Sequence, residues 1–275
     1  VAWTDVFTQS DPELAAKVIP IPIERKNAYL EPHDSPLRRS LLTGIADNEC
    51  AWMFYPSKRD DGRTVFFRED GRLFVKKTVL SRAFRPFSRR FSQREVSPLP
   101  IFKGMSAADN IRSCIRSDDC EGVSRELAFF IKGLLKRFPL GPDGRLPPCT
   151  FDAVPQNCII SDDGEFHFFD LEYDMLGGVP LMYMIFRSMA ATLYKLPVSE
   201  RRGFDFRKSM ASVADQFSVT IDEAECHRIN ASIKRFNSLG LCRILTNIWL
   251  SLLPVRSWRL RFCWWSMIPK TLERG

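Results

Sequence analysis

The sequence predicts an α+β fold, with a small antiparallel sheet early in the chain and a larger, mostly helical part after it. Three observations lead to this expectation. Residues 50–80 contain short runs of strand-forming side chains separated by turn residues. Residues 121–138 carry apolar side chains at helical spacing, and residues 157–169 return to a strand–turn–strand pattern. With 275 residues, the chain can form one large domain or two small lobes.

The chain divides by composition into three parts. The first 44 residues are rich in proline and charge and are interpreted as a lead-in or linker, in which Asp11-Pro12 has the form of a helix start. We expect residues 45–105 to form the small lobe and residues 106–275 to form the helical lobe. The chain begins with Val1 rather than Met, which suggests a piece of a longer protein.

The small lobe is expected to hold three strands. Their runs are residues 51–55, 64–68 and 72–80. A polar loop at residues 56–63 separates the first two strands, and Glu69-Asp70-Gly71 joins the last two as a favourable hairpin turn. Together they predict an antiparallel meander.

A basic segment follows the meander. Residues 81–103 carry six basic side chains and one acidic one, Glu95. Phe84, Phe87 and Phe91 recur at helical spacing, which favours a helix that buries its Phe face. The alternative is a basic surface for an anionic partner.

The second half of the chain is dominated by helical signals. Residues 106–116 and 121–138 predict two helices, and the second has its apolar residues on one face. Those residues are Val123, Leu127, Phe130, Ile131, Leu134, Leu135 and Phe138. Residues beyond Pro180 are expected to be helical, and Thr220 with Glu223 predicts a capping box for a helix running to about residue 236.

Composition excludes several classes of protein. Hydrophobic residues make up 45% and charged residues 27%, which excludes wholesale disorder.

The eight cysteines form no CxxC pair and the three histidines are scattered, so we expect no zinc site. No run of 18 uncharged apolar residues and no export signal occurs, so we expect a cytoplasmic protein with reduced thiols. The net charge of +7 suits an anionic ligand or surface.

One group of three polar residues indicates a catalytic site. Asp152 lies in a predicted loop, Asn157 follows five residues later, and Asp170 lies thirteen residues further, at the far end of the predicted hairpin. Phosphoryl transfer assisted by a metal uses such a set. One carboxylate orients the attacking hydroxyl, while an amide oxygen and another carboxylate hold Mg²⁺ against the nucleotide phosphates. The alternative is that Asp152 and Asn157 only cap turns.

These residues resemble the protein-kinase-like superfamily. Its Asp-x4-Asn catalytic loop matches Asp152 and Asn157, and its metal-binding Asp matches Asp170. The residues before Asp152 are Thr-Phe rather than His-Arg, and those after Asp170 are Leu-Glu rather than Phe-Gly, unlike an ordinary protein kinase.

The segment at residues 145–190 looks more like the kinase domain of bacterial O-antigen chain-terminating proteins, with a fainter likeness over residues 50–80. This resemblance implies a two-lobed kinase-like fold, ATP and Mg²⁺ as cofactors, and phosphorylation of a sugar hydroxyl on a lipid-linked polysaccharide. Asp152 would be the catalytic base, and Asn157 and Asp170 the metal ligands. A nucleic-acid partner is not expected.

The same resemblance assigns ATP-binding residues by position. The polar loop at residues 56–63 would cover the phosphates through Lys58 and Arg59, because it has a single glycine. The third strand would supply either Lys76 or Lys77. Side chains alternate along a strand, so Lys77 faces ATP if Val75 does. The small Val75 side chain favours Lys77, and Lys76 remains the alternative.

The C-terminal tail is basic and aromatic. Its tryptophans and arginines are Trp249, Trp258, Trp264 and Trp265, with Arg256, Arg259 and Arg261 between them. They predict either a terminal helix packed on the large lobe or a peripheral contact with the inner face of the cell membrane. Two functional alternatives remain open: a small-molecule kinase of the aminoglycoside phosphotransferase type, and a pseudokinase-like scaffold associated with the membrane.

Overall fold

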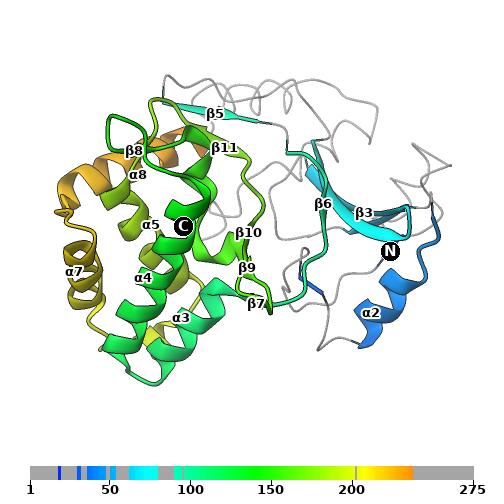
Figure 1. Ribbon diagram of the computed structural model, residues 1–275, viewed down its shortest axis with the longest axis horizontal. Helices are drawn as coiled ribbons and strands as arrows, with labels where there is room; N and C mark the ends of the chain where they lie inside the picture. The colour runs from blue at the N-terminus through cyan, green and yellow to red at the C-terminus, as the bar shows by residue number, and fades with distance from the viewer. Residues whose placement is uncertain are drawn as a thin grey trace, which may run out of the picture. The chain divides into compact units, whose positions relative to one another are not determined.

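The computed structural model describes residues 18–19, 30–31, 36–47, 50–53, 62–79, 90–94, 96–201 and 203–237 (Figure 1). The described residues form two compact units. The first holds those numbered below 86 together with residues 97–101, and the second holds residues 90–96 and 102–237. Small, mostly antiparallel sheets occur beside several helices, which confirms the α+β class.

The first unit is built on a five-stranded sheet with the order β1-β2-β3-β4-β6. The strands are β1 (Val18–Ile19), β2 (Cys50–Met53), β3 (Gly62–Glu69), β4 (Arg72–Val79) and β6 (Leu99–Pro100). The β1–β2 pair is parallel and the other pairs are antiparallel. The three strands expected between residues 50 and 80 are therefore present, within two residues of their predicted ends.

The turn between β3 and β4 has the predicted form. Asp70 and Gly71 both have left-handed backbone angles, with φ of 49° and 71°, as a two-residue hairpin turn requires. The Gly71 N–H donates to Asp47 Oδ1 at 3.1 Å, and Arg68 Nε donates to the Ile45 carbonyl at 2.7 Å. These bonds attach the segment at residues 45–47 to the β3–β4 hairpin.

Helix α2 (Pro36–Thr43) lies within the segment interpreted as a lead-in, where no helix was expected at these residues. Leu42 on this helix and Ile45 just after it are buried, as are Phe66 and Val75, which face each other across β3 and β4. Because the segment is rich in proline, its composition did not predict this short helix, which tertiary packing stabilises. Asp11, at the predicted helix start, lies outside the described residues.

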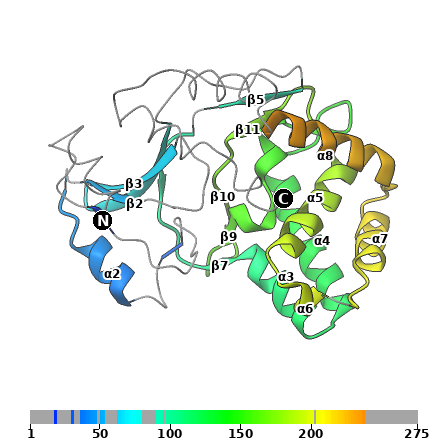
Figure 2. The ribbon, with the colours of Figure 1, turned by 180° about the vertical axis from the view of Figure 1, so that it is seen from behind.

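The second unit packs six helices with three small sheets (Figures 1 and 2). The helices are α3 (Ala107–Arg116), α4 (Cys120–Arg137), α5 (Leu181–Tyr194), α6 (Val198–Arg201), α7 (Phe206–Gln216) and α8 (Glu223–Asn237). The sheets are β10-β9-β7 (Phe166–Phe168, Cys158–Ile160, Met105–Ser106), β11-β5 (Tyr173–Met175, Phe91–Gln93) and β12-β8 (Val179–Pro180, Arg145–Leu146).

Helix α4 forms the centre of this core, as its periodicity predicts. It contacts α3, α5 and α7. Five of its predicted core residues are buried, namely Val123, Leu127, Phe130, Ile131 and Leu134. The helix begins at Cys120 because Asp119 Oδ1 accepts the Gly122 N–H at 2.8 Å as an N-cap.

Two local predictions are wrong. Phe91 lies in strand β5 rather than in a helix, because its segment pairs with β11; its side chain is nonetheless buried. Residues 81–89 lie outside the described residues. The cap of α8 is Asp222, whose Oδ1 accepts the Glu225 N–H at 3.0 Å, so the capping box of Thr220 and Glu223 is not formed. Asp222 lies directly before the helix and therefore occupies the N-cap position, whereas Thr220 lies two residues earlier.

Close packing of α4 on β10 gives a testable position. A Cβ at Gly133 would overlap Phe166 Cε1, so the ring leaves no room for a methyl group. Alanine ordinarily stabilises a helix by about 1 kcal/mol relative to glycine. Here we expect Gly133→Ala to lower the free energy of unfolding by about 1–3 kcal/mol.

Urea denaturation measures this change. Lys136→Ala, on the exposed face of the same helix, is the control and should change stability by less than about 0.5 kcal/mol. A Gly133→Ala protein more stable than wild type would contradict this packing.

Among the described residues, no helix is long and apolar enough to cross a bilayer. The tryptophans and arginines of residues 238–275 lie outside the described part, so both interpretations of the tail stay predictions.

Candidate active site

Asp152 ends a short 3₁₀ helix, η2 (Pro148–Asp152), and a second one, η3 (Pro155–Asn157), follows directly. The residues between them, Ala153 and Val154, are buried, as is Phe151 before them. Apolar neighbours therefore anchor the loop, and the Asp152 carboxylate is carried on rigid backbone.

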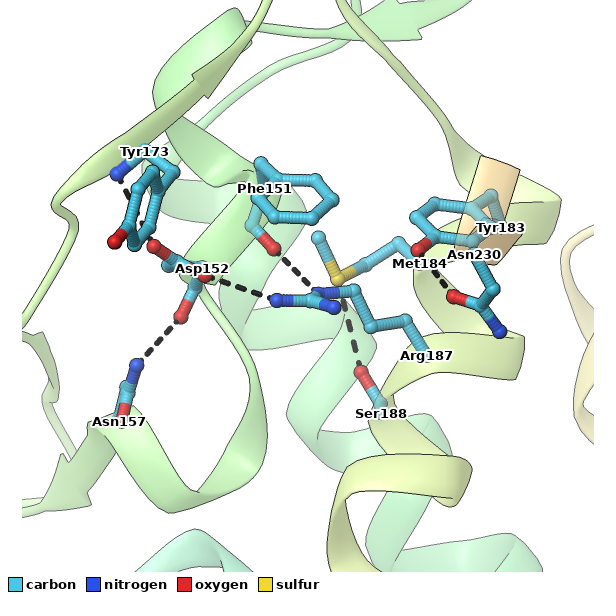
Figure 3. A network of polar contacts seen from close by, with 9 residues as sticks. All are labelled: Phe151, Asp152, Asn157, Tyr173, Tyr183, Met184, Arg187, Ser188 and Asn230. Carbon is cyan, nitrogen blue, oxygen red and sulfur yellow. Dashed lines mark hydrogen bonds and ion pairs between the residues drawn. The ribbon is translucent and has the colours of Figure 1, made fainter. Parts of the chain in front are cut away.

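Asn157 ties this loop together. Its Nδ2 donates to the backbone carbonyl of Asp152 at 2.9 Å (Figure 3). The bond joins the two ends of the Asp-x4-Asn segment. Because the amide nitrogen faces the loop, the amide oxygen is the atom left to point away from it.

The predicted hairpin is present and leads from Asn157 to Asp170. Strands β9 and β10 pair antiparallel, with Cys158 opposite Phe168. One further bond, from the Phe169 N–H to the Asn157 carbonyl at 3.0 Å, continues the pairing. Asp170 follows directly, so two residues separated by thirteen positions lie at the same end of the hairpin.

The backbone turns sharply at Asp170. Its φ is 59°, in the left-handed region, and the Glu172 N–H bonds to its carbonyl at 2.9 Å. Asp tolerates this conformation better than most residues, although it still costs energy. The turn directs the chain into β11, and the Oδ1 atom of Asp170 is buried.

Both oxygens of the Asp152 carboxylate accept hydrogen bonds (Figure 3). Arg187 Nη2 donates to Oδ1 at 2.9 Å, and the Tyr173 N–H donates to Oδ2 at 3.1 Å. The Asp152 side chain is 12% exposed, so it is largely shielded but still reaches solvent. The carboxylate is thus held in one orientation.

Burial raises the pKa of Asp152 to about 6. The positive charge of Arg187 acts against this shift, and the negative charge of Asp170 adds to it. The repulsion by Asp170 places the two carboxylates within electrostatic reach of each other. A carboxyl group with a pKa near 6 is ionised at neutral pH and is a stronger base than an ordinary aspartate.

Arg187 is a residue that the sequence analysis missed. Its Nε donates to the Phe151 carbonyl at 2.8 Å, and its guanidinium carbon lies 3.9 Å from the centroid of the Phe151 ring. One signal was available: Arg187 is the single charged residue in the otherwise apolar and neutral helix α5. A lone charge on a core helix indicates a partner, but not which one.

Gln156 lies in the same loop as Asp152 and Asn157. Within the described part of the chain, its side-chain oxygen Oε1 is buried and accepts no hydrogen bond. Such an atom costs about 1–3 kcal/mol, and it lies on the residue directly before Asn157.

The predicted ATP-binding residues belong to the first unit or lie outside the description. Lys76 is exposed on β4, while Val75 beside it is fully buried. The Lys77 backbone pairs with Thr64. The Lys77 side chain is outside the description, as are Lys58 and Arg59. The structure therefore brings together Asp152, Asn157 and Asp170 and leaves the choice of lysine as a prediction.

The residues at the hairpin end fit a magnesium ion by their chemistry. No group of three or more His, Cys, Asp or Glu side chains suited to a metal occurs among the described residues, so a closed cage of such ligands is absent there. Mg²⁺ does not need one, because it is commonly bound by one or two carboxylates together with substrate phosphates and water. Asn157 and Asp170 supply the hard oxygen atoms that such a site requires.

Comparison of the chain with protein-family models, with curated proteins and with solved structures finds no match. The functional interpretation therefore depends on the geometry around Asp152 and on the motif in the sequence.

Proposed function

We propose that this protein is a phosphotransferase that uses ATP and Mg²⁺ and acts on an alcohol group, with the kinase-like fold that its motif implies. One observation carries the proposal: two hydrogen bonds hold Asn157 against Asp152 and return the chain to Asn157 at Phe169, the residue directly before Asp170. The first joins Asn157 to the Asp152 carbonyl, and the second joins Phe169 to the Asn157 carbonyl. An isolated turn-capping role would not require the hairpin to return Asp170 to the same place.

Asp152 has the properties of the base in this reaction. Its carboxylate is ionised at neutral pH, is fixed in orientation, and retains lone pairs because each oxygen accepts one hydrogen bond. It would accept the proton of the acceptor hydroxyl as that oxygen bonds to the γ-phosphorus of ATP. The bond from the γ-phosphorus to the bridging oxygen breaks, and ADP leaves with the electron pair.

Asn157 and Asp170 are the proposed ligands of Mg²⁺. When bound, this ion would neutralise the negative charge of the phosphates. Asn157 also holds the Asp152 loop through its amide nitrogen, so one side chain both shapes the loop and presents a ligand oxygen. Lys77 or Lys76, with Lys58 and Arg59, are the proposed contacts to the nucleotide.

The proposed acceptor is a sugar hydroxyl of a lipid-linked bacterial polysaccharide. This part of the proposal is supported by the resemblance of residues 145–190 to O-antigen chain-terminating kinases. The basic, tryptophan-rich tail would place the enzyme at the inner face of the membrane, near such a substrate.

The pKa of Asp152 predicts the pH dependence of the reaction. The base must be ionised, and its pKa is about 6. We expect kcat/KM to be constant above about pH 7 and to fall about tenfold per pH unit below pH 6. Initial rates between pH 5 and 8.5 measure this profile. A limb with its midpoint near pH 4, where an unperturbed aspartate titrates, would show that the burial of Asp152 does not govern the rate.

Transfer of labelled γ-phosphate to a panel of acceptors tests the proposed function. The panel contains lipid-linked glycans, free oligosaccharides and aminoglycosides. Transfer to the glycans supports the proposal, whereas transfer to the aminoglycosides alone assigns the protein to the small-molecule kinases. Nucleotide binding without transfer to any acceptor would support the scaffold alternative.

A further inference from the structure

Arg187 is held firmly before its contact with Asp152 is considered. Helix α5 carries it into the core, and its side chain is 22% exposed. Its Nε bonds to the Phe151 carbonyl at 2.8 Å, and the guanidinium lies over the Phe151 ring. A guanidinium that donates and stacks at once has few other orientations available.

A second set of contacts, made by Tyr183, supports Arg187 (Figure 3). The Tyr183 hydroxyl, one helical turn before Arg187, donates to Asn230 Oδ1 of α8 at 2.8 Å. Tyr183 is fully buried, and its ring stacks on that of Phe151. Burial raises the pKa of Tyr183 to about 12, and the charge of Arg187 and a hydrogen bond from it act in the opposite direction. Arg187 is therefore packed between two aromatic residues and a backbone carbonyl.

The free end of the guanidinium meets the proposed base. Nη2 bonds to Asp152 Oδ1 at 2.9 Å, while the Tyr173 N–H fixes the other oxygen. The charged and titratable groups that face Asp152 are Arg187 on α5, Asp170 after β10 and the Tyr183 phenol. Arg187 is the one cation among these three, and Asp170 opposes it.

We infer that Arg187 is a positioning residue for the reaction: it fixes the orientation of the Asp152 carboxylate through the Nη2–Oδ1 contact. This inference rests on the proposed function. Arg187 would not touch the acceptor or ATP; it acts through Asp152. Replacing it should therefore lower the rate of the chemical step, while leaving nucleotide affinity unchanged.

The test compares Arg187→Met, Arg187→Lys and Arg116→Met in the full chain. Arg116 is a matched control because it also pairs with a carboxylate, Glu200 at 2.7 Å, away from the site. We expect Arg187→Met to lower kcat at pH 8 at least tenfold, because the Asp152 carboxylate loses the bond that fixes one of its two oxygens. The KM for ATP should change less than about twofold, Arg187→Lys should recover part of the rate, and Arg116→Met should match wild type.

A double variant keeps the inference testable if Arg187→Met is merely less stable. Arg187→Met in an Asp152→Asn background should cost less than about twofold more activity, because the two residues act as a unit. A loss of kcat matched by an equal loss of ATP affinity, or full additivity in the double variant, would overturn the inference and leave Arg187 a core residue.

Failure of the proposed function is distinguished by a readout that needs no turnover. Crystal structures of wild type, Arg187→Lys and Arg187→Met at pH 8 show the orientation of the Asp152 carboxylate directly. If wild type transfers no phosphate, the proposed function fails. A carboxylate that turns away from its wild-type orientation in Arg187→Met supports the positioning role, and an unchanged orientation overturns it.

Discussion

Asp170→Ala is expected to abolish stabilisation of the protein by Mg-ATP. Wild type at a ligand concentration of about 100 Kd should gain about 2.7 kcal/mol, which raises the melting temperature by several degrees. Asp170 supplies the proposed carboxylate ligand, so the variant should show no rise with Mg-ATP and an unchanged response to ATP in EDTA. Differential scanning fluorimetry with and without Mg²⁺ measures both.

The backbone of Asp170 requires a companion variant. Its φ of 59° disfavours alanine, so Asp170→Ala adds strain to the loss of the ligand. Asp170→Asn keeps a residue that tolerates this conformation and removes the charge. Asp163→Ala, in the exposed hairpin turn, is the control and should respond to Mg-ATP as wild type does. Full stabilisation of both Asp170 variants by Mg-ATP would contradict the metal assignment.

Asp152→Asn is expected to lower kcat by about 10²–10⁴ while the affinity for ATP stays within about twofold. Asparagine has the same shape, and its amide oxygen can still accept the bond from Arg187. Its amide nitrogen cannot accept the bond from the Tyr173 N–H, so the side chain loses one hydrogen bond. It also cannot accept the proton of the acceptor hydroxyl, so the main loss should fall on the chemical step. Steady-state kinetics with the acceptor, together with calorimetric titration of Mg-ATP, separates the two effects.

The matched control for this variant is Asp174→Asn. Asp174 lies in β11, close to the Tyr173 that binds Asp152, and pairs with Arg94 at 3.9 Å. A partly exposed pair of this kind contributes little to stability, so Asp174→Asn should retain wild-type kcat. Near wild-type turnover of Asp152→Asn would mean that Asp152 only shapes its loop.

Local sequence patterns predicted the parts of the site that lie close in the chain. The spacing of apolar residues located α4, and turn residues located both the β3–β4 and the β9–β10 hairpins. The hairpin alone was enough to expect Asn157 and Asp170 at one end. These features depend on interactions between neighbours in sequence, which is why a sequence pattern records them.

Contacts between distant segments were not predictable in the same way. Arg187 lies 35 positions after Asp152, and its charge indicated a partner without naming it. Phe91 showed helical spacing, yet pairing with β11 placed it in a strand. In both cases the outcome depends on which segment packs nearby, and that information is spread over the whole core.

The most direct measurement is phosphorus-31 NMR of one reaction that contains the protein, ATP, Mg²⁺ and a lipid-linked glycan. We expect ADP and a new phosphomonoester signal on the glycan to appear together, and both to be absent with EDTA or with Asp152→Asn. A phosphomonoester that forms equally well with Asp152→Asn, or no ADP and no phosphomonoester with wild type and Mg²⁺, would contradict a phosphotransferase built on Asp152, Asn157 and Asp170.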